Sequence, residues 1–179
     1  QISELPGEFV LRFMTSHPKD ASRKLFDTMA SHEKIAKQFH LPFQSGNDRI
    51  LQEMNRRYTA AQYLELIRYG REKMPEIVFT SDVIVGFPGE TEAEFKDTLR
   101  LIETVRFDAL FTFIYSPRPG TPAAKMPDPF PRADKNRRFD RLLEAQNRIS
   151  LEKHQAYIGK TCRVLLDGTD KDLLTGRTD

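Results

Sequence analysis

IVFTSDVIVGF, at residues 77–87, is the stretch of sequence that decides the fold. It is nearly continuous in β-branched and apolar residues, which is typical of a strand buried on both faces of a parallel sheet. A strand with one open antiparallel face would alternate apolar and polar residues instead. Three further apolar, β-rich segments lie at residues 9–14, 39–43 and 109–115. The sequence therefore predicts four parallel strands.

Segments with the apolar spacing of helices separate these strands. A short helix is expected after the second strand, and a longer one begins at Thr59, where Gln62 completes a capping-box pattern. Pro75 ends this longer helix. Thr91 and Glu94 repeat the capping-box pattern at the start of the next. Strands that alternate with helices of this length predict a parallel α/β fold.

Chain length narrows the choice of parallel fold. The 179 residues fall short of the roughly 250 that a closed eight-stranded barrel needs, and no GxGxxG dinucleotide fingerprint occurs. We predict part of a (β/α) TIM-like barrel over residues 1–156, followed by the start of a small all-β domain over 157–179. The opening QISELPGEF has neither an initiating Met nor a signal pattern, so we expect a longer parent protein. A cut barrel would expose a strand edge near residues 11–13.

Composition excludes the membrane and disulfide classes. No apolar run approaches the roughly 20 residues of a membrane span. The single cysteine, Cys162, suits a reducing cytosol and cannot alone hold zinc or an iron–sulfur cluster, so we expect a cytoplasmic protein. His17 and His40 each stand without a second ligand at metal spacing, and we interpret both as hydrogen-bonded structural histidines. No metal site is predicted in this chain.

The positive charge gathers near the C-terminus, although the net charge is only +2. Residues 132–163 hold nine basic and four acidic side chains, so this segment carries +5 and the remainder −3. Such a segment favours a polyanion, and a solvated helix face is the alternative interpretation. The segment is expected to be a helix to about residue 157, with a buried stripe of Phe139, Leu142, Leu143, Gln146 and Ile149.

Two further segments flank this basic helix. The connector at residues 116–132 holds six of the 11 prolines, so it can be neither a helix nor a central strand. After Gly159, the sequence TCRVLLDGTDKDLLTGRTD predicts a strand over 162–166, a turn at Gly168 and a second short strand.

Polar clusters follow each predicted strand, at residues 15–18, 44–47, 86–91 and 115–121. One such cluster is typical of a turn, but sites in parallel α/β folds lie where the strands end, so four together predict a site.

The residue types near these clusters suit a nucleoside cofactor. Gln44 and Ser45 can hydrogen-bond a ribose or an amino-acid headgroup. Ile84 and Gly86 offer an apolar wall and close backbone approach to a flat base, although Gly86 also fits a simple tight turn. Asp82 lies within an apolar strand, where it is either a ligand contact or an internal strut.

Five ordered motifs together resemble the radical S-adenosylmethionine methylthiotransferase family. Within it the chain resembles most the MiaB-type branch, which methylthiolates isopentenyladenosine at C2 beside the tRNA anticodon. Branches acting on threonylcarbamoyladenosine or on a ribosomal protein stay open, as does a non-enzymatic RNA-binding module. The motifs are TSHPKD (15–20), HLPFQSGNDRIL (40–51), MNRRYT (54–59), SDVIVGFPGETEAEF (81–95) and FTFIYSPRPGTPAAKM (111–126).

The resemblance implies roles for particular residues. The expected partner is the tRNA anticodon stem-loop, with the basic helix facing its phosphates and residues 157–179 opening a tRNA-binding TRAM domain. The implied cofactor-binding residues are Gln44, Ser45, Asp82, Ile84, Gly86 and Glu90. The implied substrate-binding residues are Arg118, Thr121, Arg137, Arg138 and Arg141.

The resemblance also implies cofactors that this chain cannot hold alone. The family uses S-adenosylmethionine and two 4Fe-4S clusters, one on a CxxxCxxC triad that is absent from this sequence. Cys162 matches no cluster ligand. We therefore expect the clusters upstream of Gln1, in an N-terminal half served by an electron-donor protein, and no activity from the chain alone.

Overall fold

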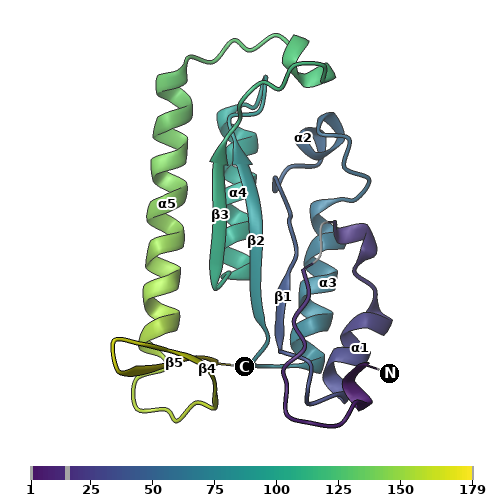
Figure 1. Cartoon of the computed structure of the whole chain (residues 1–179). Helices are drawn as coiled ribbons and strands as arrows, with labels where there is room; N and C mark the ends of the chain where they lie inside the picture. Colours follow the sequence, from purple (N-terminus) through teal and green to yellow (C-terminus); the bar gives the residue numbers. More distant parts are fainter. Residues whose placement is uncertain (1, 15–16, 179) are drawn as a thin grey trace.

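A three-stranded parallel sheet organises the computed structural model, which describes residues 2–14 and 17–178 (Figure 1). Its strands are β1 (Gln38–His40), β2 (Val78–Val85) and β3 (Ala109–Ile114), in the order β1-β2-β3. Both pairings of β2 are parallel, so the long apolar stretch is the central strand of the sheet. The prediction of a parallel α/β fold is confirmed.

The first predicted strand, at residues 9–14, is not a strand in the structure. Leu11 alone forms a parallel bridge, to Ile35, through two backbone hydrogen bonds with the neighbouring residues Lys34 and Ala36. A ladder needs several successive paired residues, and this segment has one. Phe13 still packs edge-on against Phe39, so the segment stays attached to the core by its side chain.

Helices connect the strands as the apolar spacing predicts. The capping boxes of Thr59 with Gln62 and of Thr91 with Glu94 are both present. Each satisfies backbone N–H groups that a helix start leaves without partners. The α-helices are α1 (Arg23–Ser31), α2 (Asp48–Glu53), α3 (Ala60–Lys73), α4 (Glu92–Val105) and α5 (Arg132–Gln155), and the 3-10 turns are η1 (Ile2–Glu4), η2 (Pro18–Asp20) and η3 (Pro122–Lys125).

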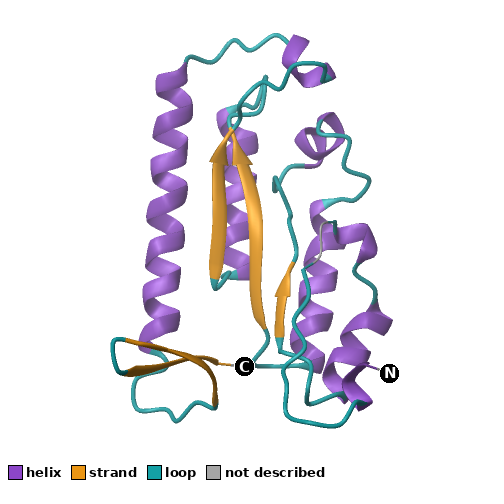
Figure 2. Ribbon diagram, in the orientation of Figure 1, coloured by secondary structure: helices purple, strands orange, loops and turns teal. Residues whose placement is uncertain are grey.

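The two faces of the sheet differ in what covers them. Phe79, Val83 and Val85 of β2 are buried on the face that carries the helices, and α4 lies behind β2 and β3 in Figure 2. The opposite face, which we call the open face, presents Asp82 and Ile84 of β2 beside Phe111 and Phe113 of β3. These two phenylalanines are 54% and 53% exposed. The open face is therefore uncovered around Phe111 and Phe113 by the part of the chain that the structure describes, whereas Thr80 on the same face is buried.

An antiparallel hairpin follows α5, made of β4 (Val164–Asp170) and β5 (Leu173–Thr178). The prediction of a turn at Gly168 is wrong, because Gly168 lies within β4 opposite Thr175, just after a bulge. Lys171 and Asp172 make the turn, both at positive φ, as in the tight turns whose twist matches that of paired strands. Every side chain described in the hairpin is exposed.

No helix in residues 2–14 and 17–178 is long and apolar enough to cross a membrane.

Candidate functional site

The loop after β1 is tied into the sheet through the backbone of Gln44. This residue has φ of 64°, and its N–H donates to the Asp82 carbonyl while its own carbonyl accepts from the Ile84 N–H, both at 2.9 Å. No hydrogen bond to the Gln44 side-chain amide occurs among residues 2–14 and 17–178. Gln44 is 6% exposed, and the expected contact of its side chain with a cofactor stays a prediction.

Ser45 and Gly46 fasten the same loop to α4. The Ser45 hydroxyl accepts from the Asn47 N–H at 3.2 Å and lies 3.4 Å from the Thr98 hydroxyl. A Cβ on Gly46 would lie 2.6 Å from the Asp97 carbonyl oxygen, so only glycine fits against α4 here. The Ser45 side chain thus contacts α4 and the start of α2, and its expected cofactor contact stays a prediction.

A polar group occupies the open face where β1 meets β2. The His40 Nδ1 lies 2.9 Å from the Thr80 hydroxyl, and its Nε2 lies 3.4 Å from the Asp82 carboxylate. The ring of His40 meets that of Phe111 edge-on at 5.7 Å. Asp82 is 29% exposed on its side chain, so it is braced by His40 and still reachable from the open face.

The contact between His40 and Asp82 was not predicted from the sequence. The interpretation of His40 as a hydrogen-bonded histidine is confirmed by its contact with Thr80. Its approach to Asp82 follows from the register of β1 on β2, which pairs His40 with Thr80. Alternation places Asp82 on the same face as Thr80, so strand order would have revealed the pair.

The loop after β2 is held by the carboxyl group of Glu90. Gly86 has φ of +72° and donates its N–H to Glu90 Oε2 at 2.7 Å. Glu90 is 1% exposed, and its Oε1 has no hydrogen-bond partner among the residues described. Burial raises the Glu90 pKa to about 7, while the Gly86 hydrogen bond and the charge of Arg138 oppose that rise.

Helix α5 closes this loop from outside. A Cβ on Gly86 would lie 2.7 Å from Lys135 Cδ, so the lysine stem fills the space that the glycine leaves. Arg138 donates to the Glu90 carbonyl at 2.6 Å, and its guanidinium lies 3.7 Å from Glu90 Oε2. The loop geometry therefore depends on two cations of a helix far along the chain.

The burial of Arg138 corrects the expectation that it faces tRNA phosphates. Its side chain is 6% exposed, because its position places it on the same helical stripe as Leu142 and Gln146. The spacing of three and four residues from Lys135 to Arg138 and on to Leu142 is a signal that could have shown this. Of the predicted stripe, Phe139 and Leu143 are only half-buried.

The other predicted phosphate contacts on α5 are exposed and already hold acidic partners. Arg137 pairs with Asp134, and Arg141 donates to Glu92 at 2.6 Å.

The predicted substrate residues Arg118 and Thr121 lie in the loop after β3. The Thr121 hydroxyl donates to the Arg118 carbonyl at 2.8 Å and closes a tight turn. The Arg118 side chain is exposed and has no acidic partner in the described chain. Of the first predicted polar cluster, Thr15 and Ser16 lie outside the described residues.

The residues of this chain do not fit an iron–sulfur cluster. No group of three His, Cys, Asp or Glu side chains in residues 2–14 and 17–178 is placed to hold a metal ion. Cys162 is exposed, just before the hairpin, far along the chain from the strand-end loops.

Comparison with known proteins gives matches of three kinds. The sequence profile of the Radical SAM superfamily matches residues 2–102. The tRNA-2-methylthio-N(6)-dimethylallyladenosine synthase of Acetivibrio thermocellus is 50% identical over 181 residues, and that of Alkaliphilus oremlandii is 47% identical over 180. Each alignment takes in 99% of this chain and 38% of the relative, so the chain spans well under half the length of these proteins.

The third kind of match is a solved structure, coproporphyrinogen III oxidase (HemN) from Escherichia coli, which is described as a radical SAM enzyme. Its TM-score is 0.53 at 20% sequence identity, over 79% of this chain and 30% of the other. This likeness concerns the fold alone: a parallel α/β sheet of the radical SAM type.

Proposed function

The chain belongs to the radical SAM superfamily, and from that premise we propose that it serves a tRNA methylthiotransferase. The reaction is insertion of a methylthio group at C2 of N6-isopentenyladenosine beside the anticodon, in the cytoplasm. The observation that carries this proposal is 47–50% identity, along 99% of the chain, to synthases named for that product. We assign residues 1–156 to the C-terminal part of a TIM-like barrel.

The open face fits the nucleoside part of S-adenosylmethionine. Ile84 offers a partly exposed apolar surface there, and the buried Gly86, packed against Lys135, shapes the loop beside it. The Gln44 amide and the Asp82 carboxylate supply polar groups at the same strand ends. When bound, S-adenosylmethionine supplies the radical chemistry, and the two 4Fe-4S clusters belong to residues outside this chain.

The residues of this chain hold side chains and loops in place around the site, and none of them takes part in the reaction itself. His40 orients the Asp82 carboxylate, and Glu90 with Arg138 fixes the loop that begins at Gly86. Arg118 and Thr121 stand at the mouth for the tRNA substrate, beyond the end of β3. An electron-donor protein and the N-terminal half complete the enzyme.

Residues 157–179 are proposed as the opening of a TRAM domain. Support comes from the hairpin, whose side chains are exposed along its whole described length. A lone two-stranded hairpin is marginally stable at best, so further strands are needed to bury these side chains.

Nucleoside mass spectrometry of tRNA tests the reaction. A strain that lacks the parent gene should lose the methylthio group and accumulate isopentenyladenosine, and the wild-type gene should restore the product. Unchanged tRNA nucleosides in the deletion strain would refute the assignment and favour the ribosomal-protein branch.

A further inference from the structure

The cations of the chain divide into those with acidic partners and those without. On α5, the basic side chains with carboxylate partners are Lys135, Arg137, Arg138, Arg141, Arg148 and Lys153. By contrast, Lys19, Arg56 and Arg57 have no acidic partner in residues 2–14 and 17–178. Six of the nine basic side chains of the C-terminal segment are thus paired, whereas these three cations near the start of α3 are not, within the described chain.

Two of these cations, Lys19 and Arg57, line one hollow, and Arg56 lies close enough to His17 to act on its charge. A concavity of about 320 Å³ lies between η2 and the start of α3, and Lys19, Arg57 and Tyr58 help to line it. The His17 ring meets that of Tyr58 edge-on at 5.5 Å. Burial, and then the charges of Arg56 and Lys19, lower the pKa of His17, as expected where positive charge is concentrated.

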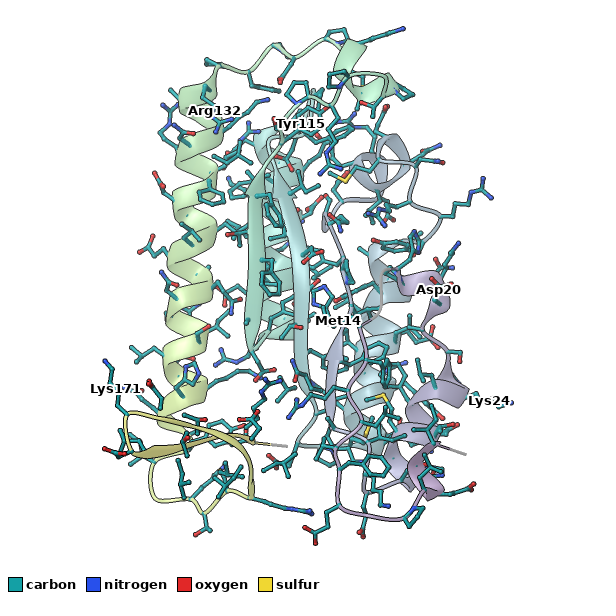
Figure 3. All side chains as sticks on the ribbon, in the orientation of Figure 1. Met14, Asp20, Lys24, Tyr115, Arg132 and Lys171 are labelled. Carbon is teal, nitrogen blue, oxygen red and sulfur yellow. The ribbon has the colours of Figure 1, made fainter. Side chains whose placement is uncertain are left out.

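Acidic groups near the hollow do not cancel this charge. Glu65 also lines it, but its carboxylate is held by Arg23 at 2.5 Å. Asp20, labelled in Figure 3, opposes the two cations in their effect on the His17 pKa without reversing it. The hollow therefore keeps an excess of positive charge.

The hollow lies at the end of the sheet where the strand-end loops lie. Strand β1 leads through α2 into α3, so α3 begins at the carboxyl end of the strands (Figure 1). Arg118 extends from the loop after β3 at the same end.

We propose that the hollow lined by Lys19 and Arg57, with Arg56 beside it, binds backbone phosphates of the RNA substrate. The inference rests on the proposed function for the identity of the polyanion, and it moves the phosphate contact from α5 to the start of α3. Guanidinium and ammonium groups without acidic partners can neutralise phosphates and release counterions, whereas paired ones must first lose a partner. The open shape of the hollow admits a phosphate together with its water.

The test is the salt dependence of RNA binding by the purified chain. Lys19→Gln with Arg57→Gln removes two exposed cations that support nothing else in the fold. The slope of log affinity against log salt should flatten by about 1.4 to 1.8, and binding should weaken by about tenfold. The matched control, Lys24→Gln with Arg68→Gln, removes the same charge from exposed sites on α1 and α3 and should leave the slope unchanged.

The possible outcomes separate this inference from the proposed function. If wild-type chain binds the RNA and the Lys19–Arg57 variant keeps the wild-type slope, the hollow is not the phosphate contact while the proposed function stands. If wild-type chain binds no RNA at any salt concentration, the inference is refuted, and the nucleoside mass spectrometry of the deletion strain decides the proposed function separately. A third measurement titrates inorganic phosphate alone at constant ionic strength and follows the His17 ring by NMR. If phosphate binds tightly while the variant keeps the wild-type slope for RNA, the hollow is a free-phosphate site and the inference is overturned.

Discussion

On one face of β2, Phe79 and Val83 are fully buried against helices, whereas on the other face Asp82 is 29% exposed beside a phenylalanine that is 54% exposed. The covered face is completed by apolar packing within the chain. The open face combines a braced carboxylate with exposed aromatic rings, which packing within the described residues does not explain. The contrast separates residues that stabilise the fold from residues that we propose meet a ligand.

The largest expected effect comes from exchanging one phenylalanine on each face for alanine. Phe79 is fully buried and meets the rings of Phe26 and Phe39 edge-on, so Phe79→Ala should cost about 4 kcal/mol of unfolding free energy. Phe111→Ala should cost less than about 1 kcal/mol, because its ring is largely in solvent already. Urea denaturation measures both, and equal losses would abolish the distinction between the faces.

The loop after β2 extends the comparison to a buried carboxyl group. Because the folded-state pKa of Glu90 is raised from 4.5 to about 7, the folded state binds its proton more tightly than the unfolded state. Protonation of Glu90 therefore adds about 3 kcal/mol to the free energy of unfolding. This stabilisation is fully present below pH 4.5 and is lost as the pH rises through 7.

Glu90→Gln should remove that part of the pH dependence while keeping an oxygen to accept the Gly86 N–H. Stability curves at several pH values between 4.5 and 8 compare the two chains. Glu92→Gln is the control, since the exposed Glu92 has a lowered pKa and should not flatten the curve in that range. Parallel curves for wild type and Glu90→Gln would contradict the assigned burial effect.

The elements best predicted from the sequence are those set by neighbouring residues. The buried β2 stretch and the two capping boxes depend on residues within one segment, and all are present. The hairpin turn was misplaced because Gly168 is the obvious turn residue, yet the strands pair through it and Lys171 with Asp172 takes the positive φ angles.

Contacts between segments that are distant in the sequence could not be predicted from the sequence alone. Arg138 looked like one charge in a basic run, and only the packing of α5 on the loop after β2 turns it towards Glu90. The pairing of His40 with Asp82 needs the order and register of the strands. Conversely, the free cations near η2 and α3 stand out only once the ion pairs of α5 are known.

A smaller effect is expected where the loop after β1 meets α4. Gly46→Ala would place a methyl group against the backbone of Asp97 and Thr98, and should cost about 2 kcal/mol. Gly89→Ala is the control, because its added Cβ meets nothing within 4 Å and its cost, from positive φ alone, is about 1 kcal/mol. Thermal unfolding of both variants measures the difference, and a cheaper Gly46→Ala would mean that α4 yields to the methyl group.

The smallest effect on stability should accompany the clearest effect on function. Asp82→Asn keeps the shape of the side chain and loses only a partly exposed charge 3.4 Å from His40, so the unfolding free energy should change by less than about 1 kcal/mol. The methylthiolated nucleoside in tRNA should nevertheless fall sharply in a strain carrying this change in the parent gene. Asp140→Asn, on the exposed side of α5, is the matched control for both measurements. If Asp82→Asn destabilises the fold and leaves the product unchanged, the carboxylate is an internal strut. The main evidence that a ligand binds to the open face is then removed.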